Sequence, residues 1–359
     1  MKVGIVGLRQ AGKTTLFRAV TKGQAPVDEY GGRPNIGVVS VPDERLKWIA
    51  EQYKPKKVTP AAVEFIDGAA KVGAEQRGKF GSDFFADVRA VDALLHVVRA
   101  FTSPAGDPPT SARDARELTE ELILADLQSI ETRLTRLEKS LISVRHGTST
   151  PETIERDLLV QIKGALESGR LVKSIPLTPD QEKMIRGFDF MTGKPQIVVA
   201  NIPESEIGRP ESEPIKELRS YCEEAGLAML PISAKFEAEV AELPEEEQRE
   251  YLESVGLKES ACDRLIAEIY KALALVTFYT ASEPEVRAWT VPKGTHVIDA
   301  AAKIHTDMAR GFIRAEVGHF DEVKAAGGWE EAKRAGVVHL QMKDYVVQDG
   351  DIIYIRFKV

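Results

Sequence analysis

Eight residues near the start of the chain, 7–14, have the types and spacing of a phosphate-binding loop. They read Gly-Leu-Arg-Gln-Ala-Gly-Lys-Thr, match the pattern G-x-x-x-x-G-K-[ST], and lie between an apolar run and a helical pattern. In such a loop backbone N–H groups point at phosphate oxygens, and the N-terminus of the next helix adds positive charge. We expect Lys13 to act catalytically by placing its ammonium on the β- and γ-phosphates, and Thr14 to offer its hydroxyl to Mg²⁺. The predicted phosphate-binding residues are Gly7, Gln10, Ala11, Gly12, Lys13, Thr14 and Thr15.

A carboxylate at the end of a later strand is the predicted partner of this loop. The strand pattern of residues 62–67 ends at Asp67, where P-loop proteins place the acid that holds Mg²⁺, usually through water. An aspartate at a strand end is also a common turn former or helix cap. The phosphate-binding loop favours the metal role, so Thr14 and Asp67 are the predicted metal ligands.

Two further strand ends carry residues of the kind that recognise a nucleotide base. Asn201-Ile202-Pro203-Glu204 stands where GTP-binding folds carry Asn-Lys-x-Asp, and Ser233-Ala234-Lys235 stands where those folds carry Ser-Ala-Lys. Three matches in this order, within one α/β pattern, are more specific than any one of them. The predicted base-binding residues are Asn201, Ile202, Glu204, Ser233, Ala234 and Lys235.

The departures from Asn-Lys-x-Asp favour ATP over GTP. An aspartate at the last position accepts hydrogen bonds from guanine N1–H and the 2-amino group, whereas adenine has neither donor and its N1 is an acceptor that a carboxylate repels. Glu204 is one methylene longer than Asp, and Ile202 replaces the lysine that packs over the nucleotide. Pro203 favours an extended Ile202, which could present its backbone to a base edge. A GTP site with an altered base loop is the alternative that these residues leave open.

The elements that must position these residues follow an alternating strand and helix pattern. Strand patterns occur at 3–6, 62–67, 93–98, 196–200 and 228–232, and helical ones at 15–20, 84–91, 214–225 and 263–275. A coiled-coil spacing interrupts them, carried by Ile123, Leu127, Ile130, Leu134, Leu137 and Leu141, and a second helical pattern follows at 154–166. We expect these two helices to form an antiparallel hairpin, because neither can bury its apolar stripe alone.

The last part of the chain has a different character. Residues 285–291 and 353–359 read as strands and 296–308 as a helix, which together predict a small α+β unit. The predicted domains are a P-loop nucleotide-binding domain at 1–112 and 195–276, an inserted helical coiled coil at 113–194, and a C-terminal unit at 277–359.

Composition and charge limit the classes of protein to which this sequence can belong. The 359 residues are 43% hydrophobic and 29% charged, as in a globular protein of two or three domains. No apolar run is long enough to cross a bilayer, and the first strand pattern begins at the N-terminus, so we expect no signal peptide, no membrane partner and a cytoplasmic location. The net charge of −8 implies no general attraction to nucleic acid. Cys222 and Cys262 lack metal-site spacing and are expected to be ordinary thiols.

The chain resembles the Obg-like ATPase family, the YchF subfamily of P-loop GTPases, over nearly its whole length. The resemblance is carried by Pro34-Asn35-Ile36-Gly37-Val38-Val39, Val41-Pro42-Asp43-Glu44-Arg45-Leu46, Val97-Val98-Arg99-Ala100-Phe101, Glu283-Pro284-Glu285-Val286-Arg287-Ala288-Trp289, Ile304-His305-Thr306-Asp307, Arg310-Gly311-Phe312-Ile313-Arg314-Ala315-Glu316-Val317, Lys343-Asp344-Tyr345-Val346-Val347 and Asp349-Gly350-Asp351. It implies an α/β P-loop G domain, an inserted antiparallel coiled-coil hairpin and a C-terminal TGS domain of the β-grasp type. It also implies ATP preferred over GTP, slow Mg²⁺-dependent hydrolysis and association with ribosomes. The family's Asn-x-x-Glu base motif falls on Asn201 and Glu204.

Two features of that family are missing from this chain. Gly31 stands where members carry a threonine that ligates Mg²⁺ and senses the γ-phosphate. The family's Asp-x-Ala-Gly reads Asp67-Gly68-Ala69-Ala70 here, and alanine is less free than glycine to reorient its peptide. We therefore expect nucleotide binding to survive, with weaker switching and hydrolysis than in typical members, as in a divergent paralogue.

Three functions are consistent with these residues. The leading hypothesis is a Mg²⁺-dependent ATP-binding protein with weak ATPase activity that acts with ribosomes or in translation. One alternative is a GTP-binding GTPase. The other is a nucleotide-stabilised ribosome-interaction module with negligible hydrolysis, which Gly31 and Ala70 favour.

Two other features of the sequence contain residue types that can carry chemistry. His96 lies inside an apolar strand pattern and is predicted to be a hydrogen-bonded core histidine. Basic residues near the hairpin could meet ribosomal RNA phosphates or form a mixed-charge helical surface, and the sequence does not decide between these. They are Arg133, Arg136, Lys139, Arg145, Arg156, Lys163, Arg170 and Lys173.

Overall fold

The structure, a computed structural model, describes residues 1–27, 34–68, 80–142 and 150–358. The chain divides into two compact units. The first contains Met1–Val38 and Glu64–Leu265, and the second contains Val39–Val63 and Ile266–Val359. The division into three domains stays a prediction, and one segment differs from it. Residues 39–63 were expected in the nucleotide-binding domain, whereas they lie in the second unit with the C-terminal residues.

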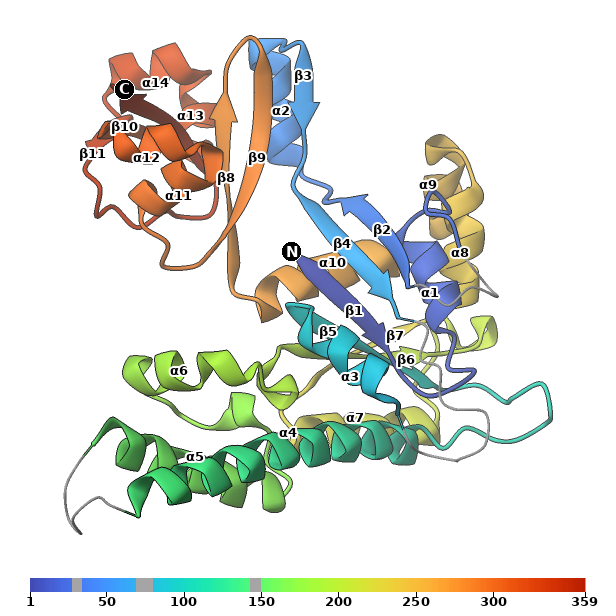
Figure 1. Cartoon of the computed structure of the whole chain (residues 1–359). Coiled ribbons are helices and arrows are strands. Elements are labelled where there is room, and N and C mark those ends of the chain that lie inside the picture. Colours follow the sequence, from blue (N-terminus) through green and yellow to red (C-terminus); the bar gives the residue numbers. More distant parts are fainter. Residues whose placement is uncertain (28–33, 69–79, 143–149, 359) are drawn as a thin grey trace. The chain divides into compact units, whose positions relative to one another are not determined.

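The first unit is built on a six-stranded sheet (Figure 1). Its strands, in spatial order, are β2 (Asn35–Ser40), β4 (Ala62–Asp67), β1 (Lys2–Val6), β5 (Ala93–Arg99), β6 (Gln196–Asn201) and β7 (Ala228–Ile232). β1 pairs in parallel with both β4 and β5, and β6 pairs in parallel with β5 and β7. The loop after β1 therefore starts between two strands from later in the chain, which is where open α/β sheets bind their ligands. The five strands predicted for this sheet are confirmed.

Helices cover this sheet. They are α1 (Lys13–Val20), α3 (Ser82–Arg89), α7 (Glu213–Glu224), α8 (Ala234–Glu242), α9 (Glu245–Ser254) and α10 (Ala261–Ala272). α1 packs against α8, while apolar residues of α3, of α7 and of the long helix α4 (Ser111–Leu141) form cores with β5 and β6. α10 ends at Ala272 rather than at the predicted residue 275, because the next strand begins at Leu275.

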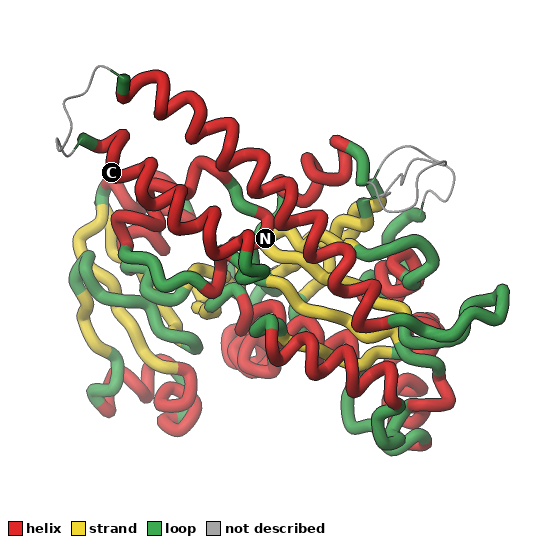
Figure 2. Tube along the Cα trace, turned by 90° about the horizontal axis from the view of Figure 1, so that it is seen from below, coloured by secondary structure: helices red, strands yellow, loops and turns green. Residues whose placement is uncertain are grey.

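The predicted inserted helices are present in the first unit. α4 (Ser111–Leu141) and α5 (Pro151–Glu167) lie side by side, as Figures 1 and 2 show. Their apolar residues share one core, which includes Leu137, Leu158 and Ile162. Thr150 caps α5 and Pro151 opens it, so the start of this helix follows from local sequence. Shorter elements then return the chain to β6, namely α6 (Pro179–Ile185) and three 3-10 turns at Val172–Ser174, Arg186–Phe188 and Met191–Gly193. A fourth turn, Glu204–Glu206, follows β6.

The second unit has a six-stranded sheet of its own. Its order is β11 (His339–Gln341), β10 (Phe312–His319), β12 (Asp351–Phe357), β8 (Leu275–Ala281), β9 (Glu285–Pro292) and β3 (Lys57–Thr59). α11 (Val297–Ile304) and α12 (Thr306–Arg310) follow β9, and residues of α11 form an apolar core with one face of the sheet. The other face packs with α2 (Glu44–Tyr53), α13 (Phe320–Ala326) and α14 (Trp329–Ala335). The single helix predicted at 296–308 is wrong. His305 is extended (φ −162°, ψ 139°) and its side chain accepts from the Asp307 N–H, which ends α11 and begins α12.

Residues 39–63 belong to the second unit because their side chains complete its core and hydrogen bonding. Leu46 and Ile49 of α2 are buried in the same core as Tyr279 and Val286. Arg45 Nη1 lies 2.7 Å from Asp349 Oδ2, and β3 pairs in parallel with β9. Local sequence shows the apolar face of α2 and cannot show that residues more than 200 positions later cover it.

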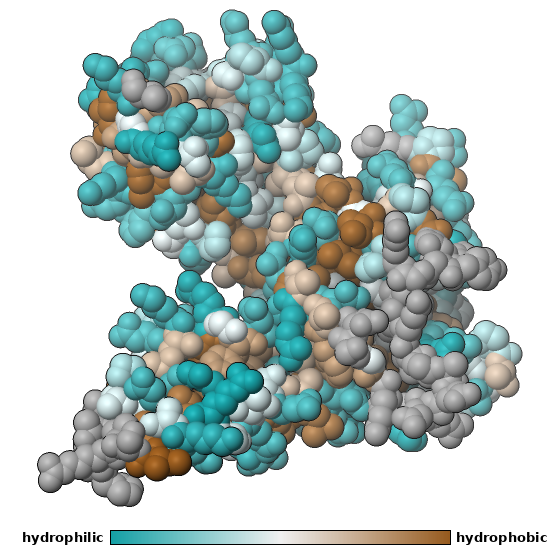
Figure 3. All heavy atoms as spheres, viewed as in Figure 1, coloured by the Kyte–Doolittle hydropathy of each residue, from teal (hydrophilic) through white to brown (hydrophobic). Residues whose placement is uncertain are grey.

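Along the described ranges of the chain, no helix is both long and apolar enough to cross a bilayer. On the face seen in Figure 3, hydrophilic side chains predominate and hydrophobic ones form separate patches. Ile142, directly after α4, is 83% exposed.

Candidate nucleotide-binding site

The phosphate-binding loop joins β1 to α1, and two of its positions admit only glycine. Gly7 has φ 149° and Gly12 has φ 94°, in the region that L side chains rarely adopt. A Cβ at Gly7 would lie 2.3 Å from the Val97 carbonyl oxygen, and one at Gly12 would lie 2.1 Å from Asn201 Nδ2. The loop is therefore pressed against β5 on one side and against the end of β6 on the other. Gln10 lies exposed at its tip with φ 60°.

Lys13 folds back over this loop. Its Nζ donates to the carbonyl oxygens of Gly7 (3.1 Å) and Leu8 (2.8 Å). Burial lowers the pKa of Lys13, and the nearby Asp67 carboxylate opposes that shift. An ammonium that burial deprives of water gains most from an anion beside it, so this group is suited to bind a phosphate.

The two predicted metal ligands meet each other, and a third residue joins them. Thr14 Oγ1 donates to Asp67 Oδ2 at 2.9 Å, and Asn35 Nδ2 donates to the same oxygen at 3.3 Å. Asp67 is 3% exposed, and burial raises its pKa above the ordinary value. The hydrogen bonds from Thr14 and Asn35 and the charge of Lys13 oppose that shift without cancelling it. Asn35 begins β2 and was missed as a site residue. Its only sequence signal was its place in the motif at residues 34–39, which says nothing of its contact with Asp67.

Asn201 ties the base-recognition segments to the phosphate-binding loop. Its Nδ2 donates to the Ala11 carbonyl oxygen (2.9 Å), and its Oδ1 accepts from the Ala234 N–H (3.0 Å). Because the residue is 5% exposed, both bonds are shielded from water. Asn201 thus orients two loops through both ends of its amide.

The other predicted base-binding residues differ in what they offer. Ile202 is 8% exposed with its side chain in a core, and its N–H donates to Ile232 O, which leaves its carbonyl as the polar group for a base. Glu204 Oε1 lies 2.8 Å from Lys235 Nζ, so the glutamate is paired across the two loops. Ser233 is buried, and its Oγ has no hydrogen-bond partner among the described atoms.

Two positions on which the sequence interpretation depended, Gly31 and Ala70, lie outside the described residues. Within the part of the chain that the structure describes, no group of three or more His, Cys, Asp and Glu side chains is placed to hold a metal ion. The metal prediction therefore depends on Thr14 and Asp67.

His96 is a core residue with one of its two nitrogens bonded. It is 1% exposed, and its Nδ1 lies 3.1 Å from Gln196 Nε2. Its Nε2 has no partner within the described part of the chain, so the predicted full hydrogen bonding of this histidine is wrong. Burial, with a smaller effect of the Lys13 charge, lowers its pKa to about 3.

Four of the basic residues of the hairpin are paired. Arg133 binds Glu155 at 2.7 Å, Arg156 binds Asp157 at 2.6 Å, and Lys163 binds Glu131 at 2.9 Å. Lys173 donates to the Gly226 carbonyl oxygen at 3.2 Å, and Arg145 lies outside the described residues. These contacts favour a mixed-charge helical surface over a site for RNA phosphates.

Comparison with known proteins places this geometry in a family. A protein-family model, YchF-GTPase_C, described as "Protein of unknown function (DUF933)", matches residues 275–358. The chain is 40% identical over 371 residues to "Ribosome-binding ATPase YchF" of Bacillus subtilis, with all of both chains covered. This chain belongs to the YchF/Obg-like ATPase family. "Obg-like ATPase 1" of Oryza sativa is 33% identical over 368 residues, covering 100% of this chain and 92% of the relative.

Solved structures agree with membership of the YchF/Obg-like family. The structure titled "Structure of the Schizosaccharomyces pombe YchF GTPase" is 30% identical, with a TM-score of 0.87 over 99% of this chain and 97% of that one. A GTP binding protein from Pyrococcus horikoshii OT3, at 20% identity and a TM-score of 0.60 over the full length of both chains, shows a likeness of fold alone. The predicted family and mixed α/β fold are confirmed, while the coiled-coil and TGS details stay predictions.

Proposed function

We propose that this protein binds Mg²⁺·ATP through the loop of residues 7–14 and hydrolyses it slowly, in association with ribosomes. The observation that carries the proposal is the convergence of Lys13, Thr14 and Asp67 at the ends of β1 and β4, with Asn201 joining the loop to the base segments. Their types fit the α- to γ-phosphates, the metal and the base of one nucleotide.

The donor set fits Mg²⁺. Thr14 supplies a hydroxyl oxygen and Asp67 a carboxylate, which are the hard oxygen ligands that Mg²⁺ prefers, and few protein ligands suffice when phosphates supply the others. When bound, the ion neutralises charge on the phosphate oxygens. Asn35 holds the Asp67 carboxylate from a second direction, and Lys13 adds its ammonium beside the loop.

The base segments support ATP. Ile202 offers a carbonyl, an acceptor that suits the 6-amino group of adenine and repels the O6 of guanine. Lys235 binds Glu204 Oε1 at 2.8 Å, so the ion pair competes with guanine N1–H for this carboxylate. A preference for GTP would require guanine to outcompete this pair.

Association with ribosomes rests on relatives. The Bacillus subtilis protein is named a ribosome-binding ATPase, and the match spans the full length of both chains. We propose the same kind of partner for this chain, acting in the cytoplasm. The TGS-like assignment of residues 277–359 is part of this proposal.

Turnover tests the enzymatic part. Phosphate release from Mg²⁺·ATP is measured with and without purified ribosomes, with Lys13→Ala as the control that removes the phosphate-binding cation. We expect slow release that the variant lacks. Phosphate release equal to that of Lys13→Ala in both conditions would instead favour a ribosome-interaction module with negligible hydrolysis.

A further inference from the structure

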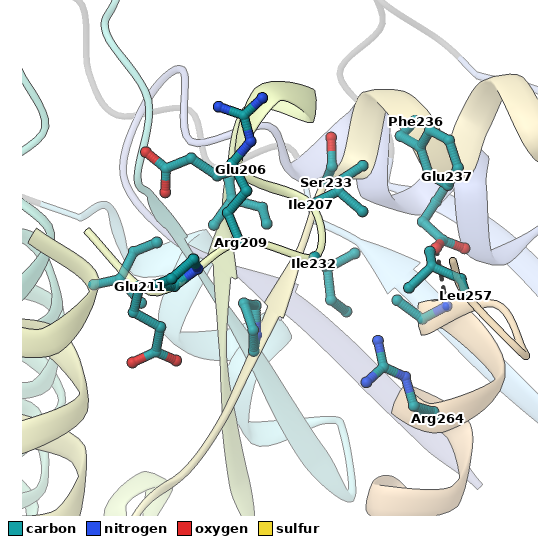
Figure 4. Close-up of a pocket in the computed structure, with 16 residues that line it drawn as sticks. Glu206, Ile207, Arg209, Glu211, Ile232, Ser233, Phe236, Glu237, Leu257 and Arg264 are labelled. Carbon is teal, nitrogen blue, oxygen red and sulfur yellow. Dashed lines mark hydrogen bonds between the residues drawn. The ribbon is translucent and has the colours of Figure 1, made fainter. Parts of the chain in front are cut away.

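A pocket lies at the edge of the first unit's sheet beside the base-recognition segments, with which it shares Ile202 and Ser233 (Figure 4). Its volume is about 260 Å³. The segment after β6, the end of β7, α8 and the start of α10 form its walls, and β7 is the edge strand of its sheet.

The walls of this pocket are largely apolar. Its large apolar lining side chains are Ile202, Ile207, Ile215, Ile232, Phe236 and Leu257, and the smaller ones are Pro210, Pro231 and Ala261. They come from separate elements of the first unit, so the tertiary fold creates the cavity. A cavity of this size and character suits the chain or ring of a small organic ligand.

The charged groups of the pocket divide into occupied carboxylates and a free cation. Glu237 is 3% exposed and accepts from Ala261 N (2.9 Å) and Cys262 N (3.4 Å) at the start of α10. Glu211 is bound by Arg219, and Glu206 accepts from Ser212 Oγ at 3.0 Å.

Arg264 is the cation available to a ligand. Its side chain extends from α10 toward the centre of the pocket in Figure 4, and within the described ranges no carboxylate lies within 4.0 Å of it. Arg209, on the other wall, turns its guanidinium away from Arg264 in the same view.

We propose that this pocket binds a small monocarboxylate with an apolar chain or ring. The apolar part lies among the six wall residues, and the carboxylate meets the guanidinium of Arg264, whose paired N–H groups match a carboxylate. Ile202 and Ser233 line the pocket and adjoin Asn201 and Ala234 in the chain, so the ligand contacts the loops that Asn201 holds together.

Calorimetric titration of the nucleotide-free protein with octanoate tests this assignment. We expect saturable binding that weakens about fifteenfold from octanoate to hexanoate, because each buried methylene contributes about fourfold. Arg264→Gln should weaken octanoate binding about fivefold, the limit for an ion pair with an exposed arginine. Arg209→Gln, which changes the arginine of the other wall whose guanidinium points away from Arg264, should leave the affinity within about twofold.

Three results would overturn the proposal. The first is that octanoate shows no saturable binding. The second is that Arg264→Gln and Arg209→Gln lose the same amount of octanoate affinity. The third is that octan-1-ol binds as tightly as octanoate. Ile207→Trp tests whether octanoate binds in this pocket. The larger side chain fills the cavity, so octanoate binding must be abolished if the pocket is the site. Thermal melting of each variant verifies folding.

A second measurement, the ATP Kd with and without octanoate, rests on the proposed nucleotide binding. Its result is interpreted independently of the octanoate titration. Because Ile202 and Ser233 line the pocket, saturating octanoate should change the ATP Kd by at least about twofold, and ATP should change the octanoate Kd by the same factor. An unchanged ATP Kd would refute the coupling of the two sites. The octanoate titration alone does not depend on whether ATP binds.

Discussion

Replacing Asn201 with alanine should damage both the fold of the first unit and its nucleotide site. The change removes the bonds of 2.9 Å to Ala11 O and 3.0 Å from Ala234 N. Ala11 is 2% exposed and Ala234 is not exposed at all, so water cannot readily replace the lost partner. Each buried polar group left without a bond costs about 1–3 kcal/mol. We therefore expect the free energy of unfolding to fall by about 3 kcal/mol.

The same change should weaken nucleotide binding. Without Asn201, the bound nucleotide must hold the loop and the Ser233–Lys235 segment in place. If ordering these two segments costs as much as one net hydrogen bond, about 1.4 kcal/mol, the ATP Kd rises about tenfold. Urea denaturation measures the free energy of unfolding, and calorimetry on the folded variant measures the ATP Kd.

Ser233→Ala is the matched control for stability. It removes a buried hydroxyl from the adjacent segment, and within the described atoms that hydroxyl has no partner to lose. We expect its free energy of unfolding to change by less than about 0.5 kcal/mol. Equal losses in the two variants, or a loss below about 1 kcal/mol in Asn201→Ala with an unchanged ATP Kd, would refute the role assigned to Asn201.

Three further changes have expected outcomes. Lys235→Met frees the Glu204 carboxylate for guanine N1–H, so the ATP-over-GTP preference in calorimetry should fall by up to about fivefold, the limit for an exposed pair; a stronger preference for ATP would contradict this. Asn35→Ala removes a donor to Asp67, so titration of Mg²⁺ into the nucleotide complex should show about tenfold weaker affinity, and unchanged affinity would remove Asn35 from the site. In the folded protein the pKa of His96 is lowered to about 3, so below its ordinary value near 6.5 the unfolded chain takes up a proton that the folded chain does not. Stability should then fall by about 1.4 kcal/mol per pH unit as the pH drops from 6.5 toward 3, and urea denaturation of His96→Gln should lack that share of the slope; identical slopes would show that His96 is not held neutral.

The strands and the phosphate-binding loop were predictable because their signals are local. Buried parallel strands such as β5 read as continuous apolar runs, and residues 7–14 carry their function in type and spacing. The two inserted helices were predictable for the same reason, since their apolar spacing shows in the sequence alone.

The remaining features depend on contacts between distant residues. Asn35 became a site residue through a hydrogen bond to Asp67, 32 positions later. The base contact of Asn201 stays a prediction, and its amide also bonds to Ala11 and Ala234, 190 and 33 positions away. α2 belongs to the second unit through contacts such as that of Arg45 with Asp349. On the hairpin, positive charge is balanced by ion pairs such as that of Arg133 with Glu155. No local pattern encodes these pairings.

Calorimetric titration of the purified protein with Mg²⁺·ATP and, separately, with Mg²⁺·GTP tests the central claim most directly. The arrangement of Lys13, Thr14 and Asp67, with the Ile202 carbonyl at the base segment, predicts saturable binding of ATP that is tighter than binding of GTP and is lost in Lys13→Ala. Tighter binding of GTP would contradict the assignment of the base segments, and no binding of either nucleotide at millimolar Mg²⁺ would contradict the nucleotide site itself.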